Sequence, residues 1–240
     1  MKAIALIRSI IFAVGQMTTL VIFSVLGQLT RPFSMKVRYG FMHYWAVINI
    51  HWLRWTCGVK YRVHGAEHID RTKSGLILAR HESAWETLYF QVLFPRQAYV
   101  LKQELLKIPF FGWGMALLNP IAIDRAAGRK ALKQILTEGT ERLQSGDWVV
   151  LFPEGTRMSP NELGKINIGG TMLAQKAGVP VYLVCHNAGS YWPKNGFIKM
   201  PGTIDVTVSK PLLPEEIKAL TTDEINQRIA DFYRQSFSQQ

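Results

Sequence analysis

Cysteine is scarce in this sequence: Cys57 and Cys185 are the only two among 240 residues, and they lie far apart. No CxxC pair and no cluster of cysteine with histidine occurs, which argues against a disulfide framework and against structural zinc. We therefore expect no metal site. Repeats, low-complexity tracts and interdomain linkers are also missing, so one catalytic domain with a short appendage is expected.

Acidic residues are also few, with 17 Asp and Glu against 28 Lys and Arg, which gives a net charge of +11. Such an excess attracts partners that carry phosphates or carboxylates. Anionic membrane lipid, nucleic acid and acidic carrier proteins all meet this condition. The cations are scattered around apolar strands rather than collected on one helix or one aromatic sheet, which argues against nucleic acid.

Charge is absent altogether from Ser9 to Leu29. At about 1.5 Å per residue, a helix of this length could cross about 30 Å of hydrocarbon, so membrane contact is expected. A signal peptide is the alternative, since Lys2 and Arg8 precede the run. No small-x-small cleavage site closes the run, which disfavours that alternative.

A second helix is predicted over residues 35–56, after the helix-breaking segment around Pro32. Its Trp45 and Trp52 share a face, and tryptophan with nearby Lys and Arg is typical of a membrane interface. An ordinary core helix rich in aromatics is the alternative. Basic residues flank the first run on both sides and give no crossing direction, so we predict a membrane-associated two-helix hairpin over residues 1–56, dipping into one leaflet.

Residues 57–240 are predicted to form an α/β domain with a largely parallel sheet flanked by helices. Short apolar runs alternate with amphipathic segments, the pattern of a buried parallel sheet. The clearest helix covers residues 129–143, and a capping box at Thr221–Glu224 opens a final helix. The predicted strands cover residues 59–63, 75–79, 97–101, 120–123, 147–152, 179–184 and 203–208.

His81 directly follows one of these buried strands, where active groups of parallel sheets often lie. Glu86 comes five residues later, so within one regular helix the two side chains would point about 140° apart. His81 must therefore lie in the turn before a helix that Ser83 caps, and the Glu86 carboxylate bends back toward it. This arrangement suits a catalytic dyad, in which the carboxylate orients an imidazole that removes a proton.

A purely structural role for Glu86 is the alternative, because Ser83-x-x-Glu86 is also a complete capping box. The other histidines have weaker cases. His186 follows a strand but has no acidic residue near it in the sequence.

The hexapeptide Phe152–Arg157 (FPEGTR) follows another strand. Pro153 and Gly155 shape a turn that gathers backbone amides and the Arg157 fork, as a phosphate site requires. A surface salt bridge between Glu154 and Arg157 is the plainer interpretation. A third strand ends on Asp124-Arg125.

These motifs, in this order and spacing, resemble the four motif blocks of the glycerolipid acyltransferase family: His81 with an acid five residues on, the strand ending in Asp-Arg, FPEGTR, and the strand opening at Val179. The resemblance covers about residues 58–210. It implies that His81 is the general base and Glu86 its orienting acid. The residues it assigns to the acceptor site are Arg125, Glu154, Gly155, Thr156, Arg157 and Lys165.

Two positions depart from the family pattern. Glu86 stands where the family usually has aspartate, and the Lys-x-Gly downstream of FPEGTR appears as Asn167-Ile168-Gly169, with Lys165 the nearest cation. The resemblance implies transfer of a fatty acyl group from acyl-coenzyme A or acyl carrier protein to the hydroxyl of 1-acylglycerol-3-phosphate, without bound cofactor. Alternatives are another lysolipid acceptor, or a non-catalytic protein that binds anionic lipid.

A direct transfer without an acyl-enzyme is expected, because no GxSxG nucleophile elbow occurs. The chain is expected at the inner membrane, with its active site on the cytoplasmic face.

Overall fold

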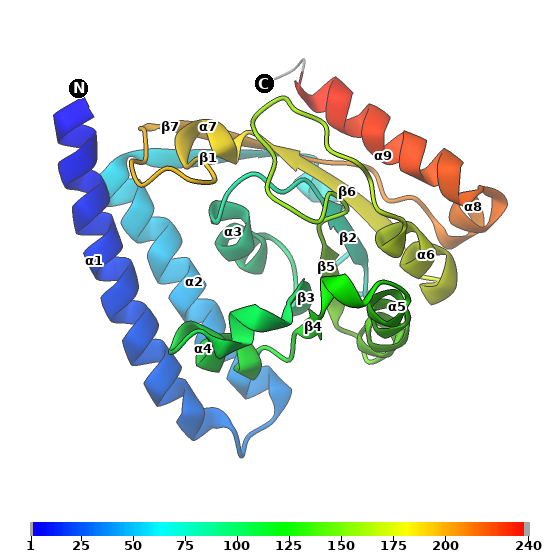
Figure 1. Cartoon of the computed structure of the whole chain (residues 1–240), viewed down its shortest axis with the longest axis horizontal. Helices are drawn as coiled ribbons and strands as arrows, with labels where there is room; N and C mark the ends of the chain where they lie inside the picture. Colours follow the sequence, from blue (N-terminus) through cyan, green and yellow to red (C-terminus); the bar gives the residue numbers. More distant parts are fainter. Residues whose placement is uncertain (1, 238–240) are drawn as a thin grey trace.

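A seven-stranded sheet with helices on both faces forms the body of the computed structural model, which describes residues 2–237 (Figure 1). The strand order is β1-β7-β6-β2-β5-β3-β4. The strands are β1 Val59–His64, β2 Leu76–Ala79, β3 Gln97–Lys102, β4 Ile121–Ile123, β5 Trp148–Leu151, β6 Val181–His186 and β7 Gly202–Val208. The helices are α1 Lys2–Gly27, α2 Met35–Cys57, α3 Trp85–Leu93, α4 Phe111–Leu117, α5 Arg129–Gln144, α6 Ile168–Ala177, α7 Ala188–Tyr191, α8 Pro214–Ala219 and α9 Thr222–Phe237.

Five neighbouring strands, β6, β2, β5, β3 and β4, run parallel to one another, and β7 pairs with β6 in the antiparallel direction. The predicted largely parallel α/β sheet is therefore confirmed. In a parallel array the carboxyl ends of all strands meet at one edge, where ligands of open α/β sheets bind. This topology brings residues that are far apart in the sequence to a single edge.

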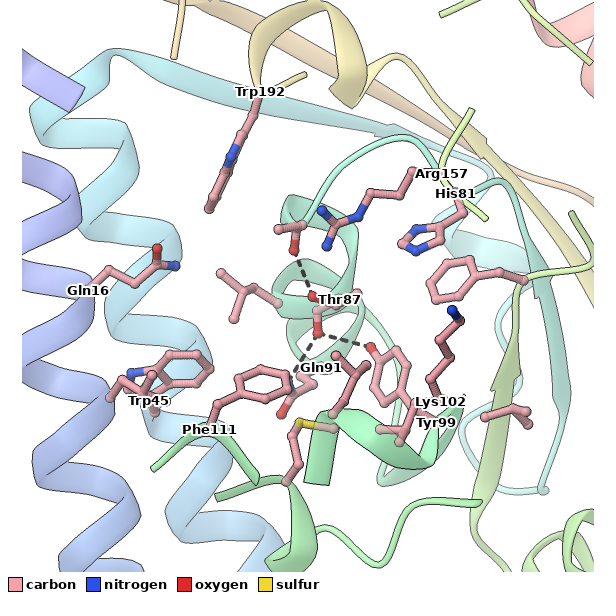
Figure 2. A pocket seen from close by; sticks show the side chains of 18 of the residues that line it. Gln16, Trp45, His81, Thr87, Gln91, Tyr99, Lys102, Phe111, Arg157 and Trp192 are labelled. Carbon is pink, nitrogen blue, oxygen red and sulfur yellow. Dashed lines mark hydrogen bonds between the residues drawn. The ribbon is translucent and has the colours of Figure 1, made fainter. Parts of the chain in front are cut away.

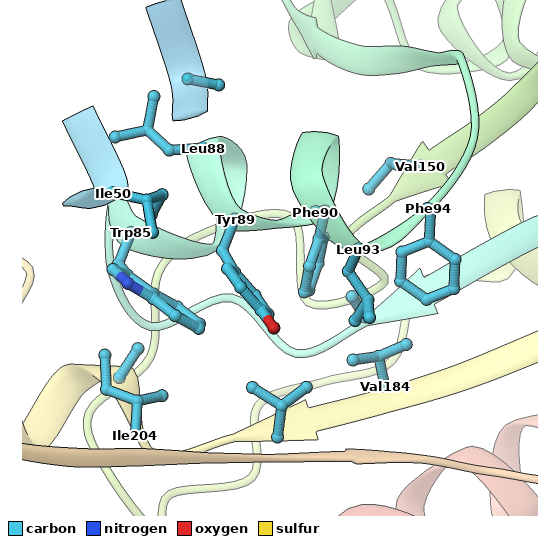
Figure 3. Close-up of a cluster of buried hydrophobic side chains, with 14 of the residues drawn as sticks. Ile50, Trp85, Leu88, Tyr89, Phe90, Leu93, Phe94, Val150, Val184 and Ile204 are labelled. Carbon is cyan, nitrogen blue, oxygen red and sulfur yellow. The ribbon is translucent and has the colours of Figure 1, made fainter. Parts of the chain in front are cut away.

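Helices cover both faces of the sheet (Figure 1), and a hydrophobic cluster lies between the helices and the sheet on each face. Helices α5, α6 and α9 pack on one face, and α1, α2 and α3 contribute to the cluster on the other. Figure 3 shows that α3 turns Tyr89, Phe90 and Leu93 toward the strands that carry Val150 and Val184. Central strands such as β2 are buried on both sides, which explains why its sequence is apolar throughout.

Helix α1 packs against α2 as the predicted two-helix hairpin (Figure 1). Gly15 allows the close approach, since a Cβ atom there would lie 2.2 Å from Nε1 of Trp52. Trp45 is buried and Trp52 half-buried, and both rings pack with the core cluster on this face of the sheet. Trp55, in contrast, is 77% exposed.

The hairpin and the α/β part share one hydrophobic core. Phe12 of α1 and Ile50 of α2 belong to the same cluster as Ile77 of the sheet. Helix α2 contacts α3, and α1 contacts α4. The predicted boundary after residue 56 falls at the last turn of α2.

Phe90→Ala should lower the free energy of unfolding by about 3–5 kcal/mol, because Phe90 is fully buried and its removal leaves a cavity between α3 and the sheet. Urea unfolding in detergent, followed by tryptophan fluorescence, measures this change. Lys133→Ala, at an exposed position of α5, is the control and should change stability by less than about 0.5 kcal/mol. Equal losses in both variants would contradict the assigned packing.

Candidate active site

The carboxyl ends of the five parallel strands each place a polar residue at the same edge of the sheet. His81 follows β2, Arg125 follows β4, the loop 152–157 follows β5, Lys102 ends β3 and His186 ends β6. Four cationic or imidazole side chains line one cavity of about 330 Å³: His81, Lys102, Arg125 and Arg157.

His81 and Glu86 form the predicted pair. Nδ1 of His81 lies 2.7 Å from Oε1 of Glu86, which also accepts hydrogen bonds from the backbone amides of Glu82 (3.0 Å) and Ser83 (2.8 Å). An ionised carboxylate only accepts hydrogen bonds, so Nδ1 carries the proton and the lone pair is on Nε2. One oxygen thus serves the dyad and the helix start at once, and the two interpretations of Glu86 do not exclude each other.

Ser83 caps the start of α3 as predicted, although the regular helix begins one residue later, at Trp85, with Ala84 at the N-cap position. The Ser83 hydroxyl accepts a hydrogen bond from the amide of Trp85 (3.2 Å), and the Ser83 amide donates to Oε1 of Glu86 (2.8 Å). The same hydroxyl donates to the carbonyl of Trp192 (2.6 Å), a partner 109 residues away that the sequence could not reveal.

Glu86 is ionised in spite of complete burial. Desolvation acts to raise its pKa, but the imidazoles of His186 and His81 and the amide of Ser83 outweigh this effect and hold the pKa below its ordinary value. The carboxylate is therefore available to stabilise a positive charge on His81. Its second oxygen, Oε2, accepts no hydrogen bond.

A buried ion network supports the backbone of His81. The guanidinium of Arg80, with no exposed surface, donates to Oε1 of Glu82 (2.5 Å), to Oε1 of Glu154 (3.0 Å) and to the carbonyl of Ser159 (2.7 Å). Oε2 of Glu154 accepts the amide hydrogen of His81 (3.1 Å). Burial raises the pKa of Glu154, and the Arg80 charge opposes that rise.

The loop after β5 is tied to the same centre. The amide of Met158 donates to the carbonyl of His81 (2.7 Å), and Asn167 donates to the carbonyl of Pro153 from its backbone (2.9 Å) and its side chain (2.8 Å). Gly155 has φ +69°, a conformation that favours glycine. Arg125 donates to the Gly155 carbonyl. These contacts fix the turn that carries Arg157.

Figure 2 shows the guanidinium of Arg157 beside the imidazole of His81, with the amine of Lys102 extending toward the same region. The sequence interpretation missed Lys102. The sequence does contain a sign of it, because Lys102 is a charged residue at the end of an apolar strand. Arg125 was predicted from a similar position, two residues after a strand.

The other predicted acceptor-site residues lie outside this cavity. Glu154 belongs to the buried ion network, and Gly155 lines a neighbouring cavity that shares Phe152 with the first. Thr156 and Lys165 are exposed and line neither cavity. Asn167, which replaces the lysine of the family pattern, is committed to Pro153. Their predicted roles in binding stay predictions.

Away from His81 the cavity is mostly apolar. Its walls come from α1, α2, α3 and α4, and the polar exceptions in this part include Gln16 and Gln91 (Figure 2). Apolar residues in these walls are Met17, Leu20, Trp45, Leu88, Phe111 and Met115. A long apolar chain can lie here with its polar end near the imidazole.

The arrangement combines a base with a free nitrogen, cations for an anionic group, and an apolar cavity. Within residues 2–237, no group of three His, Cys, Asp or Glu side chains is placed to hold a metal ion. Proton removal from a hydroxyl of an amphipathic, anionic molecule is the chemistry that these groups support.

Comparison with known proteins gives concordant matches. Residues 60–187 match the acyltransferase family. The 1-acyl-sn-glycerol-3-phosphate acyltransferase of Pseudomonas aeruginosa is 41% identical over 230 residues, covering 95% of this chain and 89% of that protein. The enzyme of the same name from Saccharomyces cerevisiae is 28% identical over 189 residues, covering 75% of this chain and 61% of that protein.

The fold is also similar to a solved structure. The 1-acyl-sn-glycerophosphate acyltransferase PlsC from Thermotoga maritima matches with a TM-score of 0.82, covering 100% of this chain and 97% of that chain. Sequence identity is 21%. The shared fold includes the N-terminal helices, because the match extends over the whole chain.

Arg80→Met should destabilise the protein by roughly 3–5 kcal/mol, because it leaves Glu82 and Glu154 buried without their cation. Chemical unfolding measures the loss. Arg62→Met is the matched control, since Arg62 is exposed and lies 3.8 Å from Asp205, and it should cost about 0–1 kcal/mol. A loss of stability in Arg80→Met as small as that in Arg62→Met would contradict the role assigned to Arg80 in the buried ion network.

Proposed function

Because this chain belongs to the acyltransferase family that includes the 1-acyl-sn-glycerol-3-phosphate acyltransferases, we propose that it acylates the free hydroxyl of 1-acylglycerol-3-phosphate and so forms phosphatidic acid. The observation that carries this proposal is the His81–Glu86 pair at a cavity that is cationic near the imidazole and apolar beyond it. An acceptor with a phosphate, a hydroxyl and a fatty chain fits this cavity, because its phosphate can contact the cations, its hydroxyl the imidazole and its chain the apolar walls.

The reaction begins when Nε2 of His81 removes the proton of the acceptor hydroxyl. The oxygen attacks the thioester carbonyl, the C–S bond of the resulting tetrahedral intermediate breaks, and the thiol leaves with the proton that His81 had taken. Glu86 stabilises the imidazolium between these two steps. Ser83 is unsuited to be a nucleophile, because its hydroxyl donates to a backbone carbonyl.

Arg157, Lys102 and Arg125 are proposed to bind the acceptor phosphate. Arginine forks match phosphate oxygens bidentately, and lysine adds a point charge. Asn167 and Lys165 add no cation to the cavity. Because the family pattern has a lysine there, a lysolipid with another headgroup is the second candidate acceptor.

The acyl donor is proposed to be acyl-coenzyme A or acyl carrier protein, acting as a substrate rather than a bound cofactor. Both are anionic, and the chain carries a net charge of +11. Arg125 and Arg129 are exposed and line the neighbouring cavity, where they add positive charge next to the cavity that contains His81.

We place the protein at the inner membrane, with the active site on the cytoplasmic face. Within the described residues, α1 is the helix long and apolar enough to cross a bilayer. One side of α1 exposes Ile7, Ile11 and Val14, whereas Gln16, Met17 and Leu20 reach the cavity. Moving a lipid tail fully into water costs about 0.8 kcal/mol per methylene, so an acceptor that keeps its tail beside α1 avoids a large barrier.

His81→Ala should lower the rate of acyl transfer by about 10²- to 10⁴-fold, the usual contribution of a general base. The assay supplies purified protein in vesicles with labelled acyl-coenzyme A or acyl carrier protein and a panel of lysolipids. Wild-type transfer to 1-acylglycerol-3-phosphate above all other lysolipids is expected. Lipid binding without transfer from any thioester would instead identify a non-catalytic protein.

Arg157→Ala should raise the Michaelis constant for the phosphorylated acceptor and affect the thioester donor less, because a charge-assisted fork to phosphate is lost. Lys130→Ala is the control, since Lys130 is an exposed cation of α5 that lines neither cavity. Its kinetics should be close to wild type. A change confined to the Michaelis constant of the donor would reverse the two sites.

A further inference from the structure

His186 is a completely buried histidine that the mechanism above does not use. It ends β6, and its ring lies between Trp85 and Phe90, with ring centroids 6.1 and 6.0 Å away. Histidine is expensive to bury unless both ring nitrogens have partners. The contacts of this imidazole therefore show what it does.

Its two ring nitrogens have distinct partners. The amide of Ala188 donates to Nδ1 (3.3 Å), so Nδ1 carries the lone pair. Nε2 lies 3.1 Å from the carbonyl oxygen of Arg80, which can only accept, so Nε2 carries the hydrogen. The backbone thus fixes the neutral Nε2–H tautomer, the opposite tautomer to that of His81.

Nε2 of His186 also lies near Glu86. Oε2 of Glu86 lies 3.9 Å from Nε2 of His186, has no exposed surface and accepts no hydrogen bond. The other oxygen of the same carboxylate holds His81. Glu86 therefore lies between two imidazoles, one that contacts the cavity and one behind it.

We propose that His186 is a positioning residue, whose Nε2–H dipole stabilises the charge on the buried Glu86 carboxylate and thereby sets the proton affinity of the His81–Glu86 dyad. This inference rests on the proposed function for its consequence in catalysis. His186 itself neither touches the cavity nor moves a proton. At 3.9 Å the interaction is electrostatic, and it shortens to a hydrogen bond if the carboxylate moves toward His186.

The sign of the effect is determined by the charge. Loss of the positive end of an N–H dipole beside an anion makes the dyad bind a proton more readily, whether the proton enters on His81 or on Glu86. The dyad then stays protonated, and so cannot act as a base, up to a higher pH. The acid limb of the pH–rate profile therefore moves to higher pH. Other titratable or charged groups that face the dyad are Tyr99 on β3 and Lys102, Arg125, Glu154 and Arg157 at the neighbouring strand ends.

Two substitutions that differ by one methylene test the proposal. In His186→Gln the side-chain amide can reach the place of Nε2 and donate to the Arg80 carbonyl and to Glu86. His186→Asn is too short to do so, but it retains a polar group near Nδ1. Both are uncharged, so a difference between them reports the N–H group rather than the loss of an imidazole.

We expect the asparagine variant to lose about 10- to 100-fold in kcat, the effect typical of removing a supporting partner, with little change in either Michaelis constant. The acid limb of its kcat/KM profile should move to higher pH. The glutamine variant should recover most of both properties. In a Glu86→Gln background the asparagine substitution should cost almost nothing further, because its partner is gone.

NMR of the His81 ring gives a readout that does not require turnover. The resonance of its Nδ1–H group, which reports the hydrogen bond to Glu86, should move in His186→Asn relative to wild type and return in His186→Gln. An unchanged resonance with unchanged pH profiles in both variants, or equal losses that persist in the Glu86→Gln background, would overturn the proposal. A wild-type protein that transfers no acyl group would contradict the proposed function, while the NMR measurement would still decide the role of His186.

Discussion

The buried guanidinium of Arg80 is the constraint on which the geometry of the active site depends. It bridges Glu82, next to His81, and Glu154, in the loop after β5. Glu154 in turn accepts the backbone amide hydrogen of His81, so His81 and the loop 152–157 are fixed relative to each other. Removing one partner of a buried ion pair is costly, and Arg80 is the partner of both carboxylates.

A single carboxylate, that of Glu86, also forms several contacts of the active site at once. Oε1 of Glu86 accepts from two backbone amides at the start of α3 and from His81. The same contacts that end the turn and begin the helix therefore fix the tautomer of the base. Glu86 can therefore have a structural role at the helix start and the proposed role of orienting His81 without conflict.

The hairpin has a similar double role. One side of α1 exposes isoleucines and valines, and the other contributes Met17 and Leu20 to the cavity beside His81. A helix in this position can contact lipid while forming a wall of the active site. The proposed chemistry needs such a wall, because the acceptor joins a hydroxyl that must be close to the imidazole to a chain that avoids water.

Local patterns alone determined much of this protein. Alternating apolar runs and amphipathic segments predicted the strands, the largely parallel sheet and the helices α2 and α5, because periodicity records which side of an element is buried. The pairing of His81 with Glu86 was also predictable, since both belong to one short turn at a helix start. Their separation of five residues left few geometries open.

Only the tertiary structure decided the contacts between strands. Arg80 and Glu154 are 74 residues apart, and His186 and Arg80 are 106 apart. Lys102 joins the site because β3 lies beside β5, and the Ser83 hydroxyl has a second partner in the distant Trp192 carbonyl. A local sequence pattern cannot predict these long-range contacts. They depend on the order of strands in the sheet, which is set by packing of the whole chain.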